Sequence, residues 1–344
     1  MSMVRAAVAG LVAVAVMVAT PVTARAEGEG GAGSRRGSTE PTVTVLNADA
    51  LNGLGSGSAV GPGGALYVTN STDGTLLRVD PDSGQAVVVG SGLPPELIDI
   101  GGATDVVFWK GRAYVIVMLA GADVGGSAAT GVYRLGDDGR FLLFADIGAF
   151  ARAHPPADPD VFLAEGVLYA IDVWRNSLVI TDGHHARVYQ VDRRGRVSEL
   201  LAFPNTDDLV TGVEVADGRL LLTTPGPIPH LPASSKVLEF RRGETTVVGQ
   251  WPASYQGNRG LIVDVEVGPR HRLYGLLQGH WDLPDDPSNE GFPAARNTGE
   301  LVRIEDGKFK TIVGGLDQPT SLDFIGRSAF VVTYTGTIVR IDGL

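Results

Sequence analysis

A pattern of short strands recurs six times along the 344-residue chain and constrains its fold more than any other feature. Each copy has an apolar tripeptide in its second strand, seen first as Leu66-Tyr67-Val68, and a third strand such as residues 76–79. The matching tripeptides begin at Ala113, Leu178, Leu220, Leu273 and Ala329, 42 to 65 residues apart. A repeat of about 42 residues with insertions is typical of four-stranded propeller blades. The sequence therefore predicts an all-β fold, a six-bladed β-propeller, instead of the two domains that length alone suggests.

The two ends of the chain complement each other in this pattern. The sixth copy ends at Leu344 after three strands, and an unassigned strand, residues 42–46, lies near the other end. Pairing of this N-terminal strand with residues 338–341 would complete the last blade and remove an exposed strand edge. The alternative, an open β-sandwich array, leaves the strand at 42–46 without a partner. We therefore expect a single closed domain at 42–344.

The first 26 residues have the pattern of a secretory signal peptide. Arg5 precedes an apolar run at 6–19, and Ala24-Arg25-Ala26 provides small residues for cleavage after Ala26. The run is shorter than the roughly 20 apolar residues of a membrane-spanning helix. Residues 27–41 are rich in Gly, Ser and Glu, which predicts a flexible leader. We expect a secreted, extracellular protein without a membrane span after cleavage.

The composition excludes several kinds of chemistry. The chain has no Cys, so disulfides, thiolate metal sites and cysteine nucleophiles are excluded. It has 28 Lys and Arg against 39 Asp and Glu, a net charge of −11, which argues against a nucleic-acid partner. No G-x-S-x-G nucleophile motif is present. We predict no cofactor, apart from the divalent cation considered below, and a monomer.

The longer loops are expected on one face of the propeller. The first-to-second and third-to-fourth turns of each blade are short, whereas the long segments belong to the other turns and the links between blades. These long segments are 119–130, 145–166, 224–236 and 278–300. Long loops on one face of a rigid scaffold are the usual place for binding. Within them, residues 146–153 predict a short helix that ends before Pro155. The candidate ligand-binding side chains on this face are His184, His230, Tyr255, His280 and Trp281.

Polar residues near the starts of the inner strands form a second candidate set, at the mouth of the central channel. They are Asp105, Asp160, Asn205, Thr211, Asn258, Asp264 and Ser321. Propellers that act as lactonases or lyases gather such groups there, whereas the plainer interpretation is that these residues cap strands and line a wet channel. In the loop at 278–290, Asp282, Asp285 and Asp286 offer oxygen ligands of the kind that calcium uses. Prolines interrupt their spacing, so a solvated acidic loop is the simpler interpretation of these three residues.

Four segments carry a resemblance to a known family. They are 146–156 (DIGAFARAHPP), 176–191, 210–215 (VTGVEV) and 315–322 (GLDQPTSL). In their order they resemble the ScyD/ScyE family of exported propellers, over about 300 residues. The resemblance implies a six-bladed, NHL-like propeller with a signal peptide, and it implies no catalytic residues. Where the family tends to have Asp-Ser-Asn-Pro-Tyr-Gly, residues 157–163 are ADPDVFL, so a site that uses that Asn or Tyr is not carried over.

These observations lead to three hypotheses about function. The first is an exported binding protein, without catalysis, whose long-loop face recognises an extracellular small molecule, glycan or protein. The alternative is a lactonase-like hydrolase or lyase with a divalent cation, calcium, at the channel mouth. A structural role in an envelope assembly is the third.

Overall fold

Antiparallel strands make up most of the protein in the computed structural model. The structure describes residues 40–51, 55–98, 100–156, 163–203, 209–227, 231–255, 257–281 and 293–344. The predicted signal peptide and nearly all of the predicted leader lie outside these residues. Among the described residues, no helix has the length and apolar character needed to cross a membrane. The all-β class predicted from the sequence is confirmed.

The strands form four-stranded units, numbered here in chain order. Unit 1 is β2 (Gly55–Val60), β3 (Leu66–Asn70), β4 (Thr75–Val79) and β5 (Ala86–Ser91), and unit 2 is β6 (Gly102–Trp109), β7 (Arg112–Met118), β8 (Gly131–Leu135) and β9 (Phe141–Asp146). Unit 3 is β10 (Leu168–Trp174), β11 (Ser177–Asp182), β12 (Arg187–Val191) and β13 (Val197–Ala202), and unit 4 is β14 (Val213–Ala216), β15 (Arg219–Thr224), β16 (Lys236–Arg241) and β17 (Glu244–Gln250). Unit 5 is β18 (Arg259–Gly268), β19 (Arg272–His280), β20 (Gly299–Glu305) and β21 (Lys308–Leu316), and unit 6 is β22 (Pro319–Ile325), β23 (Ser328–Thr333) and β24 (Ile338–Asp342) with β1 (Thr42–Asn47). Short 3-10 turns occur at η1 (Pro62–Gly64), η2 (Ala122–Val124), η4 (Pro232–Ser234) and η5 (Pro269–His271).

Strand β1 comes from the opposite end of the chain to the rest of its unit. It pairs antiparallel with β24, with Val43 opposite Ile341 and Val45 opposite Val339. Units 4 and 5 are joined into one eight-stranded sheet by a single parallel bridge between Gln250 and Lys308. The other units are separate four-stranded sheets.

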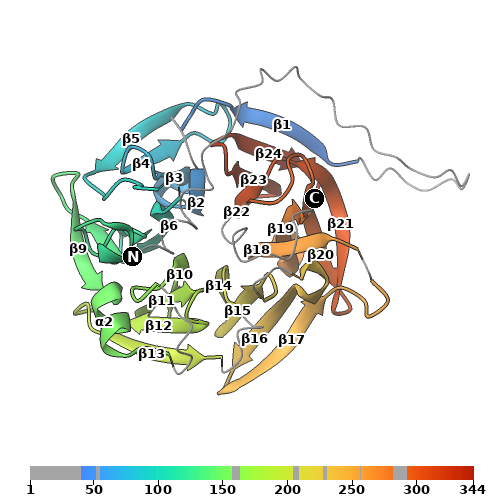
Figure 1. Ribbon diagram of the computed structural model, residues 1–344. Coiled ribbons are helices and arrows are strands. Elements are labelled where there is room, and N and C mark those ends of the chain that lie inside the picture. The colour runs from blue at the N-terminus through green and yellow to red at the C-terminus, as the bar shows by residue number, and fades with distance from the viewer. Residues whose placement is uncertain are drawn as a thin grey trace, which may run out of the picture.

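The units are arranged around a common centre (Figure 1). The first strand of each unit is the innermost: β2, β6, β10, β14, β18 and β22. Each of these inner strands contacts the inner strands of both neighbouring units, including β2 with β22. The fourth strands, and β1 in unit 6, lie at the outer rim.

The apolar core lies between neighbouring units. One cluster joins Tyr67 and Leu76 of unit 1 to Val115 of unit 2, and another joins Leu66 of unit 1 to Phe330 of unit 6. Similar clusters join units 2 and 3, 3 and 4, 4 and 5, and 5 and 6. Each fully buried Leu, Val or Phe contributes about 1.5–3 kcal/mol. Every sheet therefore packs against neighbouring units on both faces, and second strands such as β3 and β11 are buried at every residue.

Every outer strand has an irregularity at the same place. One extra residue interrupts its pairing with the third strand of the unit, as expected for a β-bulge. The extra residues are Leu46, Val89, Phe144, Leu200, Val248 and Ile312. These positions are equivalent in the repeat although the side chains differ in size.

The segment after β9 contains the helix α2 (Ile147–Ala153). The Asp146 side chain caps it by accepting a hydrogen bond from the Ala149 N–H (2.7 Å), and the helix ends at His154, just before Pro155. The short helix predicted at 146–153 is confirmed.

Candidate functional site

Carboxylates gather on the inner strands, at the centre of the molecule. The described inner strands carry Asp105 on β6, Asp172 on β10, Glu214 on β14, Asp264 and Glu266 on β18, and Asp323 on β22. We call these six residues the inner-ring carboxylates. They stand in strands that are otherwise rich in Val, Ile, Leu and Phe.

Four of the inner-ring carboxylates share one register position. Each lies opposite the middle residue of the apolar tripeptide in the second strand of its unit. The pairs are Asp172 with Val179, Glu214 with Leu221, Glu266 with Tyr274, and Asp323 with Phe330. The equivalent positions in units 1 and 2 are Ala59, opposite Tyr67, and Val107, opposite Tyr114. A row of acidic side chains therefore extends over units 3 to 6 and is interrupted by apolar side chains in units 1 and 2.

Most of these carboxylates bind the backbone of the next unit. An inner strand is the edge of its sheet, so some of its N–H groups have no partner in the ladder. Asp105 accepts from the Ile171 N–H (2.9 Å), Asp172 from Val215 (2.6 Å), Glu214 from Val267, Asp264 from Leu322 (2.7 Å), and Asp323 from Val60 (3.1 Å) and the Ser58 hydroxyl (2.5 Å). These bonds hold each of units 2 to 6 against the following one, with unit 6 bound to unit 1.

The surroundings of the inner-ring carboxylates favour their neutral form. Burial raises the pKa of Asp172 and of Asp323 to about 6, and that of Asp264 to about 8. Burial, together with the nearby charges of Asp172 and Asp264, raises the pKa of Glu214 to about 8. The pKa of Asp105 is also raised well above its usual range by burial. Hydrogen bonds from backbone N–H groups act in the opposite direction but do not outweigh these effects.

Glu266 differs from the other five carboxylates. Its carboxyl group has no hydrogen-bond partner among the described residues. Burial raises its pKa well above the usual range, and the Glu214, Asp323, Asp264 and Asp172 charges raise it further. A neutral carboxyl group without a partner has a proton that it can donate to a bound molecule.

Of the predicted channel-mouth residues that the structure describes, three share a register position on the inner strands and two make other contacts. Asp105, Asp264 and Ser321 occupy one register position on three inner strands, opposite Ile116, Leu276 and Val332. The Ser321 hydroxyl contacts that of Ser58 (2.9 Å), so it joins units 6 and 1. Thr211 contacts the Thr223 hydroxyl (2.8 Å) and donates to the Ile262 carbonyl (3.2 Å). The Asn258 carbonyl accepts from the Trp281 N–H (3.1 Å). Asp160 and Asn205 lie outside the described residues.

Sequence reasoning missed Asp172, Glu214, Glu266 and Asp323. A signal was available in the local patterns Ile-Asp-Val, Val-Glu-Val, Val-Glu-Val and Leu-Asp-Phe, where one carboxylate stands in an apolar inner strand. A charge in such a place is costly unless it is paired or neutralised.

The predicted loop residues are largely engaged in packing. Trp281 is 8% exposed and packs with Leu261 and Ala294. The Tyr255 ring stacks on Trp251 with centroids 4.4 Å apart, and its hydroxyl accepts from the Arg259 N–H (2.8 Å).

Of the predicted loop histidines, His280 and His184 are described. The His280 N–H donates to the Thr298 hydroxyl (2.8 Å). His184 is half-buried, and its Nε2 accepts from the Leu163 N–H (3.3 Å). Burial lowers the pKa of His184 to about 4. His230 lies outside the described residues.

A buried polar network next to His184 was also missed. His185 Nδ1 lies 3.1 Å from Asp182 Oδ2, to which the Tyr189 hydroxyl also donates (3.0 Å), and His185 Nε2 lies 2.8 Å from the Leu163 carbonyl oxygen. Both histidines lie in the turn between β11 and β12, and both contact Leu163.

The described residues do not form a metal centre. In the described ranges, no three His, Cys, Asp or Glu side chains are placed to hold a metal ion together. The inner-ring carboxylates are instead mostly committed to backbone N–H groups of neighbouring units. Asp282, Asp285 and Asp286 lie outside the described residues.

Comparison with known proteins supports the propeller-like fold. No family model and no curated protein sequence matches the chain. Among solved structures, virginiamycin B lyase from Staphylococcus aureus matches with a TM-score of 0.55 and 13% identity, over 88% of this chain and 99% of the lyase. A gluconolactonase from Xanthomonas campestris matches with a TM-score of 0.56 and 12% identity, over 87% of this chain and 89% of that one. An aldose sugar dehydrogenase from Streptomyces coelicolor, solved with PQQ bound, matches with a TM-score of 0.57 and 12% identity, over 88% of this chain and 98% of the dehydrogenase. The chain is therefore similar in fold to propeller enzymes of the gluconolactonase and virginiamycin B lyase kind.

Proposed function

We propose that the chain is a hydrolase or lyase that works at the centre of a six-bladed β-propeller. In this proposal units 1 to 6 are the blades, and β1 closes the ring by completing the last one. The pairing of β1 with β24 and the contact of β2 with β22 support this architecture. Membership of the ScyD/ScyE family is part of the proposal and rests on the sequence segments alone.

One observation carries the enzymatic proposal: carboxyl groups of differing acidity lie on the inner strands, close enough to raise the pKa of Glu266 by their charges. The pKa of Glu266 is raised well above its usual range and its carboxyl group has no hydrogen-bond partner among the described residues, whereas the pKa values of Asp172 and Asp323 are raised only to about 6. Titratable groups whose surroundings move their pKa values apart suit acid and base roles. The enzymes that share the fold include a gluconolactonase and a lyase, which supports this reaction class.

The chemistry requires one group to accept a proton and another to donate one. In lactone hydrolysis, Asp323 takes a proton from water as the water oxygen bonds to the carbonyl carbon. The bond from that carbon to the ring oxygen then breaks, and Glu266 donates its proton to the leaving oxygen. In a lyase reaction, Asp323 takes a proton from the carbon next to a carbonyl, and the electron pair of that C–H bond forms a C=C double bond to the adjacent carbon. The bond from that adjacent carbon to the leaving oxygen breaks, and Glu266 donates its proton to this oxygen. Because the described residues do not assemble a metal-ligand cluster, no step is assigned to a cation.

The test is turnover of a lactone panel that includes glucono-δ-lactone, and of cyclic depsipeptides for the lyase reaction. We expect Glu266→Gln to lower kcat by at least 100-fold, in the range for removal of a general acid. The exposed Glu244, changed to Gln in the same way, serves as the matched control and is expected to leave kcat unchanged. Absence of turnover above the buffer rate for the whole panel, or full activity of Glu266→Gln, would refute the proposal.

Calcium is tested separately from catalysis. The cation expected from the sequence at the channel mouth predicts that calcium raises the melting temperature by several degrees, and that Asp264→Ala abolishes the rise. No response to any divalent ion would remove the cation from the proposal and leave the carboxyl chemistry in place.

Recognition without catalysis is the second candidate. It is favoured by the hydrogen bonds that occupy both carboxylate oxygens of Asp105, Asp172, Asp264 and Asp323, because a purely structural role would use these oxygens in this way. In that case the long-loop face would bind an extracellular small molecule, glycan or protein, and the chain would act as a monomer. Export with cleavage after Ala26 belongs to both candidates, and N-terminal sequencing of the secreted protein tests it.

A further inference from the structure

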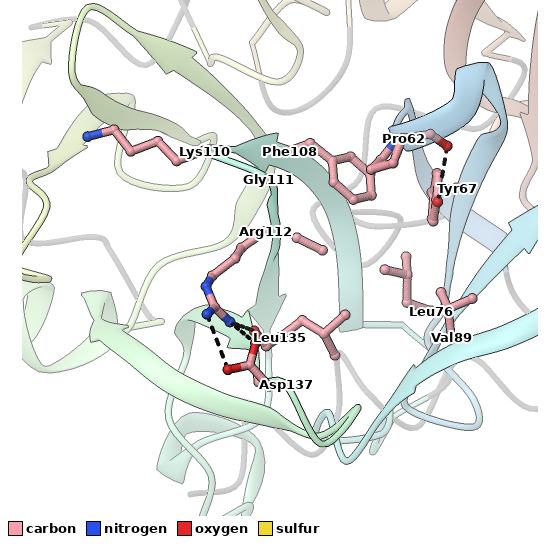
Figure 2. Close-up of a pocket in the computed structure, with 12 residues that line it drawn as sticks. Pro62, Tyr67, Leu76, Val89, Phe108, Lys110, Gly111, Arg112, Leu135 and Asp137 are labelled. Carbon is pink, nitrogen blue, oxygen red and sulfur yellow. Dashed lines mark hydrogen bonds and ion pairs between the residues drawn. The ribbon is translucent and has the colours of Figure 1, made fainter.

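A pocket of about 450 Å³ lies between units 1 and 2, and none of its lining residues belongs to the long-loop segments. It opens at the end of the molecule that holds η1, the β6–β7 turn and the β8–β9 turn. Figure 2 shows its lining, which includes Tyr67, Leu76, Val89, Phe108 and Leu135. Its volume is within the range of about 300–1,000 Å³ that is usual for small-molecule sites.

A comparison of units 1 and 2 at one equivalent position shows why there is room beside Tyr67. In unit 2 the bulged residue of the outer strand is Phe144, whose ring packs on Tyr114 with centroids 5.1 Å apart. In unit 1 the same bulge holds Val89, although Tyr67 matches Tyr114. Val89 is four heavy atoms smaller than a Phe, so the space that Phe144 fills in unit 2 stays open in unit 1.

The aromatic wall of the pocket is held in place. Tyr67 and Phe108 pack edge to face with centroids 4.6 Å apart. Gly61 lies against both rings, and a Cβ atom there would stand 2.4 Å from Phe108 and 2.6 Å from Tyr67. The Tyr67 hydroxyl donates to the Pro62 carbonyl (3.3 Å), as Figure 2 shows. The apolar surface is therefore pre-formed.

The charged group beside the apolar wall is Arg112. Its guanidinium pairs with Asp137 at 2.8 Å, and the two side chains are 43% and 89% exposed. An exposed ion pair of this kind contributes little to stability, so a ligand anion can replace Asp137 at little cost. The planar guanidinium suits a carboxylate or sulfonate, which it can bind with two parallel hydrogen bonds. Lys110 also lines the pocket, but its side chain extends away from Arg112 (Figure 2), and its Nζ lies 5.1 Å from the Trp109 ring centroid.

We propose that this pocket binds a small aromatic monoanion. The aromatic body contacts Leu76, Val89 and the edges of Tyr67 and Phe108, and the acid group binds Arg112. The site is separate from the inner-ring carboxylates, so it does not depend on the enzymatic proposal.

The test is titration of the purified protein with 2-naphthoate, followed by calorimetry and by NMR shifts. We expect saturable binding of one molecule per chain, and Val89→Phe, which copies unit 2, lowers the affinity at least tenfold. Val88→Phe is the matched control, because Val88 is the adjacent residue and is 60% exposed, and it leaves the affinity unchanged. Arg112→Gln lowers the affinity for 2-naphthoate about tenfold but not that for the uncharged 2-naphthamide.

The outcomes separate the proposal from its alternatives. Wild-type affinity in Val89→Phe, or no saturable binding of 2-naphthoate at millimolar concentration, would overturn it. If Val89→Phe does not fold, Arg112→Gln decides, because its side chain is on the surface; equal affinity for 2-naphthoate in that variant and the wild type would also overturn the proposal. Turnover in the lactone panel is measured independently, so failure of the enzymatic proposal leaves this result unaffected.

Discussion

Asp172 allows a direct measurement of what the inner-ring carboxylates contribute to stability. Two effects compete there: burial favours the neutral acid, whereas the N–H groups of Val173 and Val215, at 2.6 Å each, favour the carboxylate. The net effect is a pKa raised from 3.8 to about 6. Such a shift of about two units corresponds to about 3 kcal/mol.

The direction of the pH dependence follows from proton binding. Between about pH 4 and pH 6 the folded protein holds a proton on Asp172 that the unfolded chain has released. The stabilisation is complete below the unfolded pKa and is lost as the pH rises through the folded pKa. The side-chain amide of the Asp172→Asn variant cannot ionise, so this contribution is absent from it. We therefore expect the stability of the variant, relative to the wild type, to improve by about 3 kcal/mol from pH 4 to pH 7.

At the acidic end the variant starts at a disadvantage. The Asn side chain presents one oxygen where the carboxyl group presents two, so one backbone N–H is left poorly paired at a cost of about 1–3 kcal/mol. Asp172→Asn should thus be less stable than the wild type at pH 4 and comparable or more stable at pH 7.

Urea unfolding at pH 4, 5, 6 and 7, followed by tryptophan fluorescence, measures the difference. Asp82→Asn is the matched control, because the Asp82 side chain is 92% exposed. A plot of its free energy of unfolding against pH should run parallel to that of the wild type. Parallel curves for Asp172→Asn would refute the reasoning. If the variant instead loses stability relative to the wild type as the pH rises, the two hydrogen bonds outweigh burial, and Asp172 stabilises the fold as an ionised carboxylate.

Three further predictions concern the fold and the loop face. Leu66→Ala removes a fully buried side chain between units 1 and 6 and should lower the free energy of unfolding in urea by about 2–5 kcal/mol. Val88→Ala, at an exposed position, should stay within about 0.5 kcal/mol of the wild type. Deletion of residues 1–47 leaves β24 as an open edge, so we expect a lower melting temperature and association that grows with concentration in size-exclusion chromatography; a monomer of unchanged stability would contradict the role of β1. His184, with its pKa lowered to about 4 by burial, should remain neutral down to about pH 5 in an NMR titration, and a midpoint near 6.5 would show that its ring is solvated.

The repeat made the strands predictable, and the residues that face the centre were predictable only in part. Asp105, Asp264 and Ser321 were identified from their place at the starts of inner strands, and the structure puts them in one register position. Asp172 and Glu266 were missed because they lie further along their strands than the starts from which the candidates were chosen. Their burial also depends on the neighbouring units, which a local pattern does not describe.

Packing decided the roles of the loop aromatics. Trp281 is in the long-loop segment 278–300 and Tyr255 is in or beside a link between blades, positions that favoured ligand stacking from the sequence. In the structure Trp281 is covered by Leu261 and Ala294, and Tyr255 stacks on Trp251. An aromatic residue in a loop buries its ring wherever a neighbouring surface is available, because the apolar area removed from water is large.

The sequence by itself determined the all-β class, the repeating strand order and the short helix predicted at 146–153, since these follow from local alternation, turn residues and capping. Only the tertiary structure decided which carboxyl groups meet at the centre, because proximity there arises from five separate strands brought together around one centre. It also decided where the pocket lies: Val89 and Phe144 are ordinary apolar residues in the sequence, and their difference in size matters only where two sheets pack against each other.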